Sequence, residues 1–112
     1  MKIDVLGTTY EVKYRRREDD KNLEQCDGYT DCSAKMIVVE EKDWEPMDQM
    51  DLKEYQRMIV RHEIVHAFLH ESGLSGCSIV TDVPWAKNEE MVDWFAIQSP
   101  KIFKAFEEAE CL

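Results

Sequence analysis

The sequence RHEIVHAFLHESG at residues 61–73 decides the expected fold and holds its most reactive side chains. It contains one H-E-x-x-H motif, formed by His62, Glu63 and His66, in a run whose apolar residues fit a helix buried on most sides. Residues four apart share one helical face, so both imidazoles can reach one Zn²⁺ at about 2.0–2.1 Å. Glu63 follows the first histidine and can act as general base on a metal-bound water.

A zinc site that keeps one position open for water needs a third protein ligand, which must come from outside this motif. His70 lies about 12 Å of helix rise from His62, which is too far for one ion to span comfortably. A metzincin pattern is also excluded, because Leu69 and Ser72 occupy its glycine and histidine positions.

The acid pair Glu89 and Glu90, at the start of the next expected helix, supplies the remaining candidates. Glu89 and Asp93 are four residues apart, so Glu89 could bind the metal while Asp93 accepts the free ring N–H of a ligating histidine. Acids in a first turn are also favourable without a metal, because they complement the helix dipole. With the motif upstream, we expect one of the pair to be a ligand, Glu89 ahead of Glu90.

The composition limits the classes of protein to which this chain can belong. The 112 residues fit a single domain spanning 1–112, and 14 basic against 24 acidic side chains give a formal charge of −10. This balance argues against a nucleic-acid partner, since phosphate binding needs clustered Lys and Arg. Without a signal-peptide pattern or a long apolar run, we expect a cytoplasmic protein outside the membrane. The four cysteines are then expected to be free thiols.

Alternating and apolar runs predict four strands, at residues 2–6, 10–14, 29–32 and 35–39. The last is nearly continuous in apolar residues and should be the most buried. The motif helix should start at Asp48 or Asp51 and end at Gly73. After a connector, helices are expected at 89–98, capped by Asn88, and at 101–109, with Ser99 and Pro100 at its start. This order predicts an α+β domain, with the helices packed on one face of a small antiparallel sheet.

Two stretches together resemble the small gluzincin-type metallopeptidases, in particular ImmA/IrrE-like proteins and their compact versions in phages and mobile elements. These are MIVRHEIVHA at 58–67 and NEEMVDWFA at 88–96. Those families pair H-E-x-x-H with a later helix of the form E-x-x-A-[ND]-x-F-A, in which this chain has Val92 for the usual alanine. The resemblance implies a zincin-like fold, bound zinc and hydrolysis of peptide bonds. It also suggests site-specific cleavage of a regulator protein.

The expected mechanism places Zn²⁺ on His62, His66 and Glu89, with Glu63 as general base toward a peptide or protein substrate. The substrate could add as a strand to an exposed sheet edge. The group that stabilises the oxyanion is left open among Tyr10, Tyr29 and His70. Trp85 is a candidate wall of the substrate pocket.

Two other hypotheses compete with an active peptidase. In the first, the chain is a catalytically inactive zincin-like binding or inhibitory protein, whose metal site is structural or vestigial. A fourth protein ligand such as Cys77 or His70, in place of water, would favour it. In the second, the acidic residues 107–112 occupy the cleft of a latent peptidase; a frayed, exposed helix end is the simpler expectation.

Overall fold

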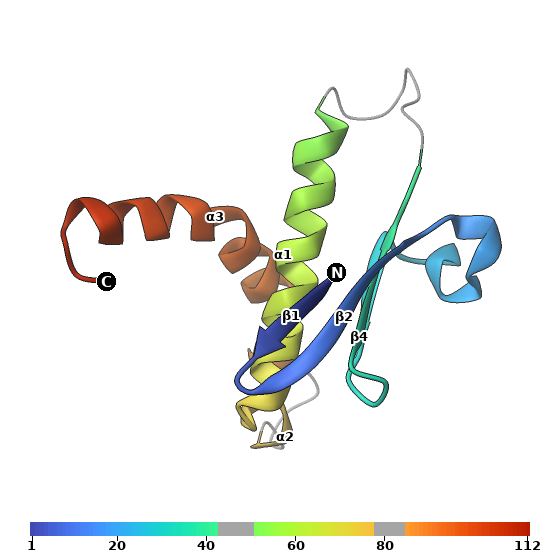
Figure 1. Ribbon diagram of the computed structural model, residues 1–112, viewed down its shortest axis with the longest axis horizontal. Coiled ribbons are helices and arrows are strands. Elements are labelled where there is room, and N and C mark those ends of the chain that lie inside the picture. Colours follow the sequence, from blue (N-terminus) through green and yellow to red (C-terminus); the bar gives the residue numbers. More distant parts are fainter. Residues whose placement is uncertain (43–50, 78–84) are drawn as a thin grey trace.

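The structure, a computed structural model, describes residues 1–42, 51–77 and 85–112, with the side chains of residues 76 and 77 left out. The strands are β1 (Lys2–Val5), β2 (Thr8–Arg15), β3 (Gly28–Asp31) and β4 (Met36–Glu40). The helices are α1 (Leu52–Glu71), α2 (Leu74–Cys77) and α3 (Glu89–Glu108), and short 3₁₀ turns lie at Arg17–Asp19, Lys21–Glu24 and Trp85–Lys87. The α+β class is confirmed (Figure 1).

The four strands form one sheet in the order β1-β2-β4-β3, and the expectation of a wholly antiparallel sheet is wrong. β1 pairs with β2 and β3 with β4 in antiparallel fashion, but β2 and β4 are parallel. The reason is that β4 enters between β2 and β3. Residues 16–35 give the chain enough length to cross over and return in the same direction. β3, although third in sequence, therefore becomes an edge strand.

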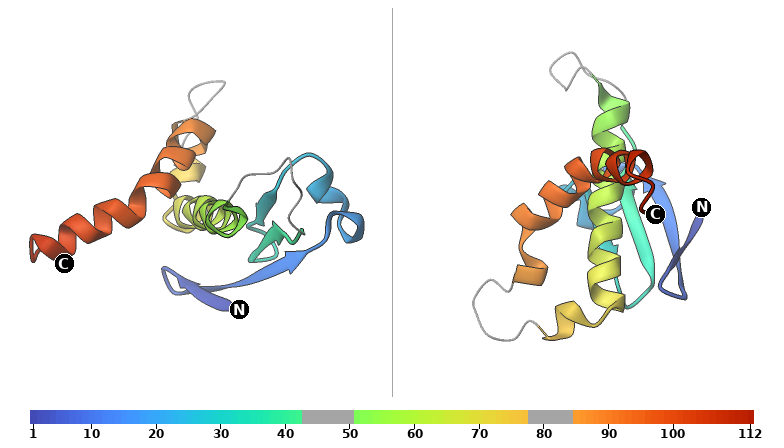
Figure 2. Two further views of the ribbon diagram at one scale, coloured as in Figure 1. Left: turned by 90° about the horizontal axis from the view of Figure 1, so that it is seen from above. Right: turned by 90° about the vertical axis from the view of Figure 1, so that its left-hand side faces the viewer.

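The core lies between this sheet and α1 (Figure 2). Ile37, Val38 and Val39 of β4 are all essentially inaccessible to solvent, which confirms that this strand is the most buried. Ile37 and Val39 belong to one apolar cluster with residues of β1, β2 and α1. α1 in turn lies between the sheet and α3, so the second long helix packs on the first (Figure 2).

Both predicted ends of the motif helix are confirmed. The Asp51 carboxylate accepts a hydrogen bond from Glu54 N at 2.9 Å and caps α1, whereas the alternative cap Asp48 lies outside the described residues. At the other end Gly73 has φ of 83° and its N–H donates to His70 O at 3.0 Å. That left-handed conformation is accessible to glycine without a steric penalty, so the helix stops there.

The prediction of two helices after residue 88 is wrong, because α3 continues through Pro100. Proline has no N–H, so the carbonyl of Ala96, four residues earlier, loses its helical hydrogen bond. Arg61 of α1 replaces it, since its Nε donates to Ala96 O at 2.6 Å. The helix bends instead of ending, and its second half points away from α1 (Figures 1 and 2). The predicted cap Asn88 is confirmed, with its side chain accepting from Met91 N at 2.9 Å.

The last turn of α1 is tied to the sheet through the carboxylate of Glu71. It accepts hydrogen bonds from the Tyr10 hydroxyl and from Lys35 Nζ, both at 2.7 Å, and from the Thr8 hydroxyl at 3.3 Å. These donors, the Lys35 ammonium first and the Tyr10 hydroxyl next, lower the pKa of Glu71 from its ordinary 4.5 to about 2. The ionised carboxylate thus links α1 to the β1–β2 hairpin and to the turn before β4.

Stability should therefore depend on pH through Glu71. Because the folded-state pKa is depressed, its contribution is present above about pH 4.5 and is lost as pH falls toward about 2. In urea unfolding, Glu71→Gln should have a lower midpoint than wild type at pH 7, and the gap should narrow as pH falls from 5 to 3. Glu107→Gln, on the exposed end of α3, should follow wild type at every pH. A gap that stays constant down to pH 3 would contradict this role.

Among the described residues, no helix combines the length and the apolar composition needed to cross a membrane.

Candidate metal centre

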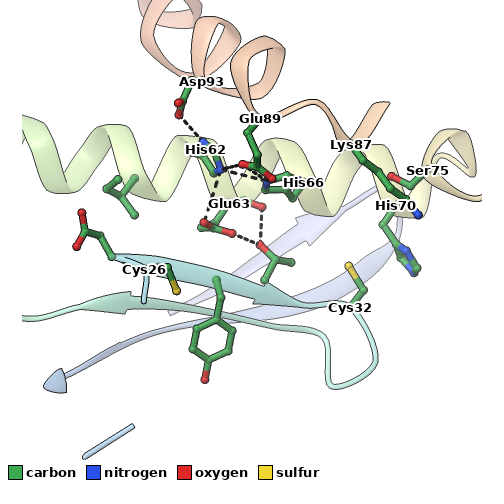
Figure 3. Close-up of a pocket in the computed structure, with 15 residues that line it drawn as sticks. Cys26, Cys32, His62, Glu63, His66, His70, Ser75, Lys87, Glu89 and Asp93 are labelled. Carbon is green, nitrogen blue, oxygen red and sulfur yellow. Dashed lines mark hydrogen bonds and ion pairs between the residues drawn. The ribbon is translucent and has the colours of Figure 1, made fainter. Parts of the chain in front are cut away.

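A cleft of about 570 Å³ lies where α1 passes over β3 and meets the start of α3 (Figure 3). All five residues predicted for the site line it: His62, Glu63, His66, Glu89 and Asp93. The first three come from one face of α1, and the acids come from the first two turns of α3. The helical spacing and the packing of α3 on α1 together bring these side chains into one place.

The side-chain atoms that could bind a metal converge closely. His62 Nε2 lies 2.9 Å from a Glu89 carboxylate oxygen, His66 Nε2 lies 3.2 Å from the other, and the two Nε2 atoms are 3.0 Å apart. Ligands held at about 2.0–2.1 Å around a tetrahedral zinc are separated by about 3.3 Å. In the described part of the chain, each of these three side chains offers one ligand atom, and the three atoms lie within 4.8 Å of one another. Their spacing fits one tetrahedral ion.

The chemistry of the three donors also fits a cation. His62 Nδ1 lies 2.6 Å from an Asp93 carboxylate oxygen, so this nitrogen carries the ring proton and donates it. In the neutral ring Nε2 then presents a lone pair, directed at the Glu89 carboxylate and at His66 Nε2. Lone pairs that face one another at about 3 Å repel unless a cation or a proton lies between them. Asp93 therefore has the position expected of a residue that fixes the tautomer of a metal-binding histidine.

Glu63 lies beneath the histidines and is almost fully buried, with 7% of its side chain exposed. Burial disfavours the ionised form and raises the pKa of its carboxyl above the ordinary value, although the Thr30 hydroxyl and the neighbouring imidazoles oppose the shift. Thr30 Oγ1 donates to Oε2 at 2.7 Å, and Oε1 lies 3.9 Å from His62 Nε2. One carboxylate oxygen is thus held by β3, while the other faces the histidine cluster.

The two acids at the start of α3 are distinguished by their positions. Glu89 reaches both histidines, whereas Glu90 does not line the cleft. The preference for Glu89 over Glu90 thus agrees with the geometry. The Glu89 side chain is 68% exposed, so its position depends on the α3 N-terminus and not on close packing around it.

The candidates for oxyanion stabilisation differ in where their polar groups lie. The Tyr10 hydroxyl donates to Glu71, outside the cleft. Tyr29 lines the cleft, but its hydroxyl donates to the buried Asp20 at 2.6 Å. His70 lines the cleft at the end shared with Lys87, which the sequence had not singled out (Figure 3). Of the three, His70 is the one that this geometry favours.

The structure bears on three other expectations, of which the one for Trp85 is wrong. Trp85 lines an apolar groove of about 700 Å³ on another side of α1 and α3, so it is not a wall of the metal cleft. Residues 107–112 lie at the far end of α3, away from the cleft, as expected for an exposed helix end (Figure 1). Cys26, Cys32 and Cys111 are free, as predicted, while the side chain of Cys77 lies outside the described residues.

Sequence reasoning also missed Thr30 and Gly28, which face α1 from the edge strand. The signal available for them was the period of two along β3, which puts both residues on one face.

Comparison of the chain with protein-family models, with curated proteins and with solved structures found no match. The resemblance to ImmA/IrrE-like peptidases thus depends on the motif residues at 58–67 and 88–96 alone.

Proposed function

We propose that this chain is a zinc-dependent metallopeptidase with a zincin-like fold, similar to the ImmA/IrrE-like enzymes. The observation that carries the proposal is the convergence of His62, His66 and Glu89 directly above a buried glutamate, Glu63. A structural zinc site would need the three donors and a fourth protein ligand, but would not need a buried carboxylate beside them. That extra carboxylate supports an enzyme over the alternative of a binding or inhibitory protein.

Each residue of the site then has a defined task. His62, His66 and Glu89 would hold the zinc ion, which would act as a Lewis acid and lower the pKa of a bound water. Glu63 takes the proton of the attacking water on its free oxygen and returns it to the leaving amine. Asp93 keeps the proton of His62 on Nδ1, so that Nε2 can bind the metal.

The position of β3 supports a peptide as the substrate. Among the described strands it pairs with β4 alone, and residues 28–30 line the cleft beside the histidines. Its free edge can therefore accept an extended peptide by main-chain hydrogen bonds, which would place a peptide bond close to the metal. Regulated cleavage of a regulator protein is the substrate class that the family resemblance suggests.

Metal removal tests the proposal directly. Protein purified with zinc available should contain one zinc per chain and cleave unfolded protein substrates. Dialysis against a strong chelator should abolish cleavage, and stoichiometric zinc should restore it. The wild-type chain after mock dialysis is the control. Purified protein that contains no zinc would disprove the proposal, as would cleavage that persists once the zinc has been removed.

A further inference from the structure

The edge strand β3 approaches α1 closely at Gly28, below the turn of α1 that carries Glu63. At Gly28 an added Cβ would lie 2.8 Å from Ile59 Cγ2 of α1 and 3.1 Å from the Val38 carbonyl oxygen. The second of these is backbone and cannot move aside without shifting β4. Glycine at this position therefore permits the spacing between strand and helix that brings the next residue on the same face, Thr30, to Glu63.

Thr30 contacts Glu63 at two points. Its Oγ1 lies 2.7 Å from the Glu63 carboxylate oxygen Oε2 and 2.9 Å from the Glu63 backbone oxygen. A hydroxyl has one proton, and the bond to an ionised acceptor is the stronger one. The carboxylate is thus held at Oε2, close to its own backbone. This leaves Oε1 as the oxygen that faces His62.

We propose that Thr30 is a positioning residue for the peptidase reaction, because it fixes the rotamer in which the free oxygen of Glu63 faces the metal. This inference rests on the proposed function. Without the hydroxyl, the carboxylate would retain its burial but would be free to rotate about its side-chain bonds. Since Thr30 sits on the strand that we expect to receive the peptide, the same strand would align both the substrate and the base.

A purely structural role for Thr30 is the competing explanation, in which the hydroxyl only joins β3 to α1. The two roles differ in what they change. A structural role would alter folding, zinc content or substrate affinity, whereas a positioning role lowers kcat while KM and zinc stoichiometry stay as in wild type.

The test compares Thr30→Val, which keeps the shape but loses the hydroxyl, with Thr30→Ser, which keeps the hydroxyl. In the zinc-loaded protein, with a peptide from a substrate cleaved by wild type, Thr30→Val should reduce kcat by roughly 10- to 100-fold. KM and zinc content should not change, and Thr30→Ser should stay within about threefold of the wild-type kcat. Thr30→Ala replaces Thr30→Val if the valine variant does not fold.

A wild-type kcat in Thr30→Val, or a loss in Thr30→Ser as large as that in Thr30→Val, would overturn the inference and leave the proposed function intact. A loss in Thr30→Val that appears only in KM or in zinc content would assign the residue a structural role. If the wild-type protein shows no cleavage that is lost in Glu63→Gln, the proposed function itself is wrong, and the positioning role of Thr30 is wrong with it. The Glu63→Gln variant, measured in parallel, separates these cases.

Discussion

Glu63→Gln should bind zinc as wild type does and cleave peptides roughly 10²–10⁴-fold more slowly, because it removes the group that accepts the proton of the attacking water. Gln has nearly the same shape, and its side-chain oxygen can still accept the hydrogen bond from Thr30. The three proposed ligands are left in place. Since Glu63 is buried and burial raises the pKa of its carboxyl, loss of the charge should not reduce stability.

The measurement is kcat/KM for one peptide together with zinc content by elemental analysis. Glu54→Gln is the matched control on the same helix, because Glu54 is half exposed and lies in the first turn of α1, away from the cleft. It should keep wild-type activity within about twofold. Cleavage by Glu63→Gln at the wild-type rate would remove Glu63 from the mechanism, even if zinc were bound.

Glu89→Gln should weaken zinc binding by more than the roughly 10–100-fold that loss of a residue hydrogen-bonded to a ligand typically costs. A neutral amide is a much weaker ligand than a carboxylate and no longer offsets the charge of the ion. Two histidines alone would then hold the metal, and activity should fall with occupancy. Competition with a chromophoric chelator measures the affinity directly.

Glu90→Gln provides the control for this substitution, because Glu90 is the neighbouring acid in the same first turn of α3. Both substitutions remove one favourable interaction with the helix dipole, so their effects on folding should be similar. Only Glu89→Gln should lose zinc. If Glu90→Gln lost zinc and Glu89→Gln retained it, the ligand assignment would be wrong while the two-histidine motif could stand.

Local signals in the sequence identified the parts of the fold that depend on few residues. Residues close in sequence determine the helix caps Asp51 and Asn88 and the end of α1 at Gly73. The run of apolar residues in β4 likewise marks it as the buried strand. The two halves of the candidate site were predictable for the same reason, whereas their convergence depends on the packing of α3 on α1. Helical spacing alone places His62 beside His66 and Glu89 on the same face as Asp93.

The features that the sequence did not reveal depend on contacts between distant segments. The parallel pairing of β2 with β4 results from where β4 enters the sheet, which no local pattern specifies. Pro100 should end a helix by its own chemistry. It does not, because Arg61, far away in sequence, hydrogen-bonds the carbonyl that proline leaves unpaired. The contact of Thr30 with Glu63 likewise requires the strand and the helix to be in place first.

Among the described strands, β3 has one edge without a partner strand, and this edge also bears on aggregation, since an unpaired strand edge is a template on which other chains can add. Here the edge is four residues long and ends in Asp31, whose pKa lies below its usual range because the Ser33 hydroxyl and the Ala34 N–H donate to it. The carboxylate therefore stays charged, and copies with a formal charge of −10 repel one another. An edge open to a short peptide is in this way protected against edge-to-edge stacking of the protein on itself.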